Sequence, residues 1–183
     1  MPYKVYSNTY EVMRSFLAAN IAKGVFQSQQ YPDNLRRRLN EITALSLQWD
    51  NKTVEQMVKD RHRLDRFLGL RWFRKEILLK YIGGWPYIGD LPRGWCQGAV
   101  TDVAHFLAEH SDFNSKSQKR IQAMVPIIDE VLRFFPPILV SGGELRHGPE
   151  FLFLPFDVDD GSHRCIAAVL AEKESITAFV GAT

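Results

Sequence analysis

The sequence predicts an α/β protein of the α+β type, with a helical N-terminal half packed on a small mixed sheet. Two observations indicate this class. Apolar residues recur at helical spacing through most of residues 7–81, which is typical of amphipathic helices. Beyond residue 135, short apolar runs are bounded by turn-forming residues, as expected for strands. We expect these strands near residues 138–141, 151–156 and 175–180.

The bulk composition suits a folded protein of modest size. The chain has 183 residues, of which 45% are hydrophobic and 24% charged, enough for one domain or two small ones with a core. It contains no run of eighteen apolar residues and no hydrophobic signal core, so we expect a cytoplasmic protein without membrane insertion. Cys96 and Cys165 lack C-x-x-C spacing, which favours free thiols in a reducing compartment.

The charge is divided unevenly along the chain. Residues 1–95 hold 16 Lys and Arg against 9 Asp and Glu, whereas residues 96–183 hold 7 against 12. The halves therefore carry +7 and −5. Glycines, prolines and aromatics are dense over residues 83–95, so we place the boundary between a basic helical subdomain and an α/β subdomain there. The asymmetry suits either nucleic-acid contact or attraction between the halves.

The N-terminal half is expected to form three helical segments. They cover residues 7–30, residues 34–49, and a long segment that runs from a cap at Asp50, Asn51 or Thr53 to about residue 81, with a possible division at Gly69. Cations at positions 59, 63, 66 and 74 recur near the helical period, so a continuous helix would carry a basic face. The candidate DNA-binding residues are Arg36, Arg37, Arg38, Arg63, Arg66, Arg74 and Lys75. The alternative is an ordinary solvated surface.

The second half should begin with two helices, over residues 98–110 and 116–134. Pro126 is too late for a first-turn position, so it should kink or split the second helix. Phe135-Pro136-Pro137 then stops the helix, and a strand is expected to follow.

A short polar run, Asp159-Asp160-Gly161-Ser162-His163-Arg164, organises the C-terminal part. It lies between the apolar stretch 151–154 and the alanine-rich stretch 165–171, and so reads as a turn from strand to helix. Gly161 permits the reversal, and Asp160 or Ser162 can cap the helix. The first-turn N–H groups, with His163 and Arg164 beside them, would form an anion site best suited to phosphate.

Over about residues 116–183, the order of these elements resembles the ParB/sulfiredoxin superfamily. The resemblance rests on the Pro-Pro-Ile strand start, the Asp-Gly-x-His-Arg turn, the alanine-rich helix and the closing strand. It implies a small α/β nucleotide-binding fold used for phosphoryl transfer, nucleotide-gated DNA binding or nuclease action. Ser162 stands where sulfiredoxins carry the catalytic cysteine, so sulfiredoxin chemistry is not expected. A gapless count back from Pro136 places Arg120 at the position of the phosphate-gripping lysine of sulfiredoxins.

Within the superfamily, the total size, the helical N-terminal half and the serine resemble plasmid-encoded fertility-inhibition proteins. This resemblance implies ATPase and DNase activity, with a partner in a conjugative transfer apparatus (type IV secretion). No residue pattern in the chain itself indicates that partner.

The expected roles follow from the chemistry of each side chain. Arg164 is expected to hold phosphate in a fork, and His163 to donate to a phosphate oxygen or to move a proton. Asp159 or Asp160 is expected to hold Mg²⁺, and Glu144 is a candidate base or second metal ligand. The candidate site, with ATP and Mg²⁺ as expected cofactors, is Arg120, Glu144, Asp159, Asp160, Gly161, Ser162, His163 and Arg164.

Two functions of different classes fit these observations. The first is a nucleotide-binding hydrolase with ATPase and/or Mg²⁺-dependent DNase activity. The second is a non-catalytic interaction protein that docks its helical half on a partner. In that second case Asp160 only caps a helix, His163 only packs, and Glu144 lies in a solvated loop.

Overall fold

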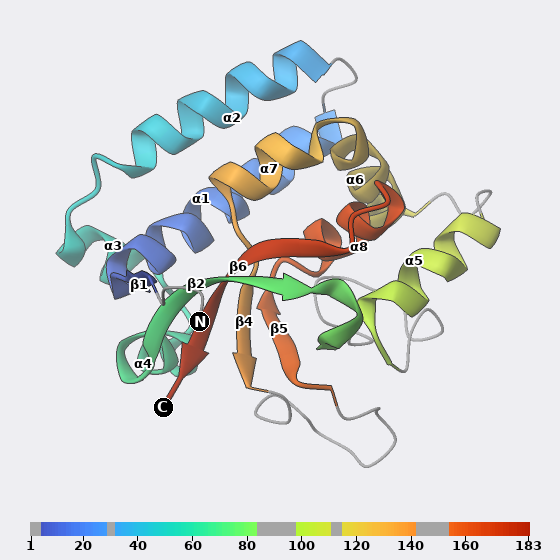
Figure 1. The fold of residues 1–183 in the computed structure, drawn as a ribbon. Helices are drawn as coiled ribbons and strands as arrows, with labels where there is room; N and C mark the ends of the chain where they lie inside the picture. The colour runs from blue at the N-terminus through green and yellow to red at the C-terminus, as the bar shows by residue number, and fades with distance from the viewer. Residues whose placement is uncertain (1–4, 29–31, 84–97, 111–114, 142–153) are drawn as a thin grey trace.

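The computed structural model describes residues 5–28, 32–83, 98–110, 115–141 and 154–183. Their architecture is α+β, as expected: helices cover a single six-stranded mixed sheet of order β1-β2-β6-β4-β5-β3 (Figure 1). Seen in Figure 1, the long helices α1 and α2 and the shorter α7 lie together above one end of the sheet, and α4 lies near the C-terminus. The helical N-terminal half is confirmed.

The N-terminal half contributes both helices and strands. Its elements are β1 (Val5–Ser7), α1 (Thr9–Ser28), α2 (Pro32–Ser46), α3 (Asn51–Met57), α4 (Arg61–Gly69), β2 (Arg71–Leu78), the 3₁₀ turn η1 (Leu79–Tyr81) and β3 (Ile82–Gly83). Asp50 caps α3, because its Oδ1 accepts a hydrogen bond from the Thr53 backbone N–H at 2.7 Å. The same bond lowers the pKa of Asp50, since it favours the ionised carboxylate.

The expectation of helix up to residue 81 is wrong, because residues 71–78 form a strand. β2 pairs antiparallel with β6 over eight residues, from Arg71 opposite Ala182 to Leu78 opposite Ser175. Trp72 is buried, and its indole N–H donates to the Phe67 carbonyl at 2.9 Å. Pairing with a distant strand therefore overrides the local helical pattern. The expected continuous basic face does not form either, because Arg66 lies on α4 and Arg74 on β2.

The second half follows the expected order of elements. These are α5 (Val100–Glu109), α6 (Lys116–Met124), the 3₁₀ turn η3 (Val125–Ile127), α7 (Ile128–Phe134), β4 (Ile138–Ser141), β5 (Phe156–Asp160), α8 (Ser162–Leu170) and β6 (Ser175–Ala182). Pro126 lies inside η3, so the expected split of the helix is confirmed. The strand expected near residues 151–156 runs instead from Phe156 to Asp160, and residues 151–153 lie outside the described part.

Side chains of alternate residues in the central strands pack into two apolar cores on opposite faces of the sheet. Trp72, Ile138 and Phe179 pack with the first half of α1 and with α4, whereas Leu139 and Val180 pack with α8 and its neighbours. The two halves of the chain share this sheet through β2 and β6. The predicted boundary at residue 95 lies outside the described residues. Within the described ranges, no helix has the length and apolar character needed to cross a membrane.

Candidate phosphate-binding site

Gly161 makes the turn from β5 into α8. Its φ of 107° lies in the left-handed region that favours glycine. A Cβ at this position would lie 2.8 Å from Nη2 of Arg164, so a side chain would also collide with a buried guanidinium. Gly161 itself occupies the cap position of α8, and no side chain caps this helix. The expectation that Asp160 or Ser162 caps it is therefore wrong.

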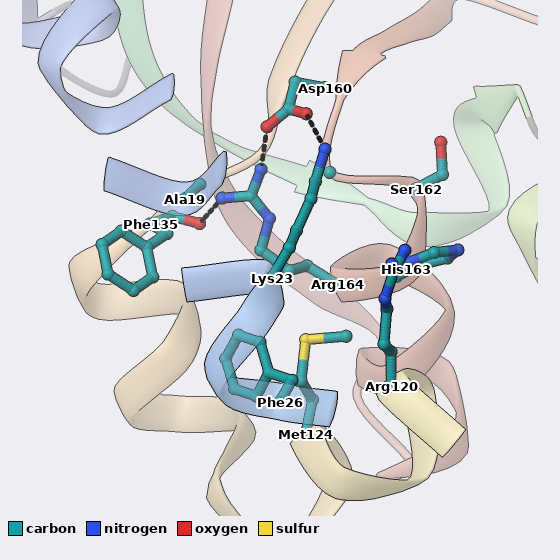
Figure 2. Close-up of a pocket in the computed structure, with 11 residues that line it drawn as sticks. Ala19, Lys23, Phe26, Arg120, Met124, Phe135, Asp160, Ser162, His163 and Arg164 are labelled. Atoms are coloured by element: carbon teal, nitrogen blue, oxygen red, sulfur yellow. Dashed lines mark hydrogen bonds and ion pairs between the residues drawn. The ribbon is translucent and has the colours of Figure 1, made fainter. Parts of the chain in front are cut away.

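Arg164 is a buried structural arginine. Its Nη2 donates to the carboxylate of Asp160, and its Nη1 donates to the Phe135 carbonyl at 2.5 Å (Figure 2). The guanidinium thus joins the start of α8, the end of β5 and the end of α7. Both terminal nitrogens of the expected phosphate fork already have protein acceptors.

Asp159 and Asp160 project from opposite faces of the sheet, because they are consecutive residues of β5. Asp159 accepts from Arg66 Nη2 at 2.5 Å and lies 3.4 Å from Arg63 Nε, both from α4. Asp160 faces Arg164 and also lies 3.7 Å from Lys23 Nζ of α1. Each carboxylate is therefore neutralised by cations from a different part of the molecule.

This arrangement does not fit the expected Mg²⁺ site. Asp159 already has Arg63 and Arg66 as cationic partners, and Asp160 has Arg164 and Lys23, so either carboxylate would have to give up these partners to bind a metal ion. The described residues contain no group of three or more His, Cys, Asp or Glu side chains placed to hold a metal. Glu144, the other expected ligand, lies outside the described residues.

A small pocket opens at the start of α8, with a volume of about 40 Å³. Side chains of α1, α6 and α8 converge on it, as Figure 2 shows. Arg120 of α6 and His163 of α8 both line it, and Lys23 extends from α1 toward Asp160. The lining residues are Ala19, Lys23, Phe26, Arg120, Met124, Phe135, Asp160, Gly161, Ser162, His163 and Arg164.

The structure thus brings most of the expected site together. Asp160, the turn residues and Arg120 meet at this pocket, whereas Asp159 faces away from it. The sequence did not lead us to predict Lys23 as a site residue. The only sign of such a role is that Lys23 is the single basic residue in the second half of α1. Only the fold could show that α1 crosses the start of α8.

The electrostatics of the pocket favour an anion. Lys23, Arg120 and Arg164 supply three positive charges against the single carboxylate of Asp160, which leaves +2 in the lining. The first-turn N–H groups of α8 have no acceptor within the helix and lie at the positive end of its dipole. A phosphate group fits this set of donors.

Cys165 takes no part in the pocket. It is fully buried in the core behind α8, and burial raises the pKa of its thiol to about 12. A thiol that stays protonated near neutral pH is a poor nucleophile.

The seven candidate DNA-binding residues do not gather on one face. Five of them are engaged in ion pairs within the protein: Arg36 with Glu130 and Asp33, Arg37 and Arg38 with Glu41, and Arg63 and Arg66 with Asp159. The hydrogen bond and charge of Glu130 raise the pKa of Arg36. The remaining two lie over aromatic rings, Arg74 over Phe179 and Lys75 over Phe73. Most of this charge is therefore balanced internally.

No protein-family model, curated protein or solved structure matches the chain in the comparisons. The resemblance to the ParB/sulfiredoxin superfamily therefore stays a prediction from the order of motifs.

Proposed function

We propose that this protein binds the terminal phosphates of a nucleoside triphosphate at the start of α8 and hydrolyses the terminal phosphoanhydride. One observation carries the proposal: Lys23, Arg120 and His163, from three different helices, meet at a helix start with a net positive lining. ATP is the expected nucleotide. The pocket of about 40 Å³ is small, so only the phosphate end would enter it, with the nucleoside at its mouth.

Each lining residue has a defined part in binding. Arg120 would donate to the phosphate oxygens through its planar guanidinium, and Lys23 would add a mobile point charge. Lys23 is 42% exposed and already bonded to Asn20 Oδ1 at 2.7 Å, so it can turn from Asp160 to a ligand without leaving the pocket. Arg164 would act indirectly, by holding Asp160 and the helix start in place.

His163 is the candidate general base for hydrolysis. It belongs to the first turn of α8 and lines the same pocket as Arg120 (Figure 2). A water molecule would attack the terminal phosphorus, its proton would pass to the imidazole, and the bond to the leaving diphosphate would break. The protein side chains described above supply positioning and charge for this step, without a protein-held Mg²⁺.

Calorimetric titration with ATP, in the presence and absence of Mg²⁺, tests binding. Arg120→Ala removes a charge-assisted contact worth about 1.5–3 kcal/mol, so we expect the ATP affinity to fall at least tenfold. His163→Gln keeps a polar side chain but cannot take the proton. We expect its ATP affinity to stay near that of the wild type, while phosphate release slows by about 10²–10⁴-fold.

Arg37→Ala is the matched control, because it removes an exposed arginine of α2 that does not line this pocket. It should leave both ATP affinity and phosphate release unchanged. If folded wild-type protein produces no heat with ATP, the proposal fails. If phosphate release is equal in His163→Gln and wild type, the activity belongs to another site or a contaminant. Incubation of plasmid DNA with the same variants tests the DNase expectation.

The exposed apolar end of α2 supports the second candidate, a docking protein. Leu45 is 50% exposed and Leu47 73% exposed near the end of this helix, so together they offer apolar surface to a partner. Replacing both with serine should abolish capture of a partner, such as a conjugative transfer component, without changing ATP binding. Loss of ATP binding in that variant would contradict a separate docking surface.

A further inference from the structure

A second cavity, of about 180 Å³, lies between α1, the end of α2, α7 and the sheet. Three arginines from distant parts of the chain line it: Arg14 of α1, Arg74 of β2 and Arg133 of α7. A volume of this size greatly exceeds the roughly 10–15 Å³ that one water molecule requires. None of the residues in the α8 pocket lines this cavity.

The three arginines are held in position by neutral groups. Arg14 donates from Nε to the Trp49 carbonyl and from Nη2 to Asn51 Oδ1, both at 2.9 Å. Arg74 lies over the Phe179 ring at 6.0 Å, and Arg133 over the Phe134 ring at 4.7 Å. Stacking on a ring fixes the plane of a guanidinium and leaves its N–H groups available at the edges.

Arg74 and Arg133 have no ion pair with a carboxylate among the described residues, whereas the charge of Arg14 also acts on Asp50, which does not line the cavity. The acidic side chains of the adjoining cavity, which Arg74 and Arg133 also line, are engaged elsewhere: Asp129 pairs with Lys173 at 2.7 Å, and Glu76 accepts from Ser175 Oγ at 2.5 Å. Glu11, exposed on the first turn of α1, is the single acidic residue among the lining residues. Three cations and one carboxylate leave a lining charge of +2. Most other arginines of the described chain are, in contrast, paired with acids.

Ser15 lines the same cavity and carries a hydroxyl that could turn toward it. Its hydroxyl oxygen is buried and has no hydrogen-bond partner within the described part of the chain. Buried polar atoms are nearly always satisfied by protein or by a bound species. A hydroxyl can donate to an anionic oxygen, as the arginines can.

We propose that this cavity is a binding site for a phosphate group, distinct from the pocket at the start of α8. Arg74 and Arg133 would supply charge-assisted hydrogen bonds, and Arg14 and Ser15 would complete the set of donors. The phosphate could belong to a small free ligand or to the backbone of a nucleic acid. Pyrophosphate is the probe of the first source, and a short DNA duplex is the probe of the second.

The test is calorimetric titration of the full chain with pyrophosphate, and separately with a short DNA duplex, at low ionic strength. Arg74→Gln and Arg133→Gln remove the two stacked guanidinium groups, and far-UV circular dichroism checks that both variants stay folded. Arg133 is exposed on α7, so we expect Arg133→Gln to fold normally. This variant keeps the test valid if Arg74→Gln fails to fold. Arg37→Gln is the control for loss of one positive charge. Arg120→Ala removes a donor from the pocket at the start of α8.

We expect pyrophosphate affinity to fall at least tenfold in both Arg74→Gln and Arg133→Gln, and to survive in Arg37→Gln and in Arg120→Ala. If instead the duplex alone depends on Arg74 and Arg133, the bound phosphate comes from a nucleic-acid backbone. Affinities for both probes that are unchanged in the folded Arg133→Gln variant would overturn the proposal. So would pyrophosphate binding that disappears only in Arg120→Ala, since the anion would then lie at the start of α8.

Discussion

Arg164→Met will lower the free energy of unfolding by about 3 kcal/mol, near the lower end of the 3–5 kcal/mol range for a broken buried ion pair. The side chains of Arg164 and Asp160 are only 7% and 8% exposed, so the substitution leaves a carboxylate with little solvent. Lys23 offers Asp160 a weaker partner at 3.7 Å, which limits the loss. Urea denaturation of the wild type and the variant measures the difference.

Arg37→Met is the matched control for that comparison. Its side chain is 71% exposed and lies 3.9 Å from Glu41, so its removal should change stability by less than about 1 kcal/mol. An Arg164→Met variant as stable as the wild type, yet unable to bind ATP, would contradict a structural role. Arg164 would then be a phosphate ligand, as the sequence predicted.

Asp159→Ala will also destabilise the protein, by about 2–4 kcal/mol, because Arg63 and Arg66 lose their shared acceptor. The two arginine side chains are 26% and 24% exposed, so water relieves part of the loss. The effect should concentrate where α4 meets β5. Hydrogen exchange should therefore show a larger loss of protection in α4 than in α8.

Asp65→Ala serves as the control, since Asp65 is an exposed acid on the same helix. Its removal should leave both stability and the protection of α4 near wild-type values. The same experiment addresses the expected metal role of Asp159. If Mg²⁺ raises the melting temperature of the wild type but not of Asp159→Ala, Asp159 is a metal ligand and the structural account is wrong.

The parts of the fold that the sequence predicted well depend on local signals. Pro126 divides α6 from α7, and the pair Pro136-Pro137 ends a helix just before β4. The Ala-rich stretch after Gly161 forms α8, and β6 closes the chain as expected. In each case the backbone limits of a proline or glycine, or a clear period of apolar residues, act within a few positions.

The parts that could not be predicted depend on partners far along the chain. Trp72 and Phe73 are adjacent and both buried, so β2 lacks the simple alternation of a strand, and only its pairing with β6 determines its form. Arg63 and Arg66 appeared to be a DNA-binding face, but their acceptor, Asp159, lies more than ninety residues away. No periodicity within α4 could reveal it.

The candidate site divides in the same way. The helix start and Arg120 were found from spacing and resemblance, and both line the pocket. The pairing of Asp160 with Arg164 was not predicted, because Arg164 was expected to bind phosphate. Asp160 is the last residue of β5, so its pair with Arg164 spans the turn between β5 and α8. The guanidinium of Arg164 is therefore engaged within the protein and not available to a ligand.

NMR observation of the His163 imidazole during addition of ATP tests directly whether ATP binds at the start of α8. His163 lines the pocket, whereas His62 lies exposed on α4 and serves as an internal reference. We expect the His163 ring resonances to shift progressively and to saturate with ATP, while those of His62 do not move. In Arg120→Ala, the ATP affinity obtained from these shifts should be at least tenfold lower. A His163 signal that stays unchanged at saturating ATP would contradict a phosphate site at the start of α8.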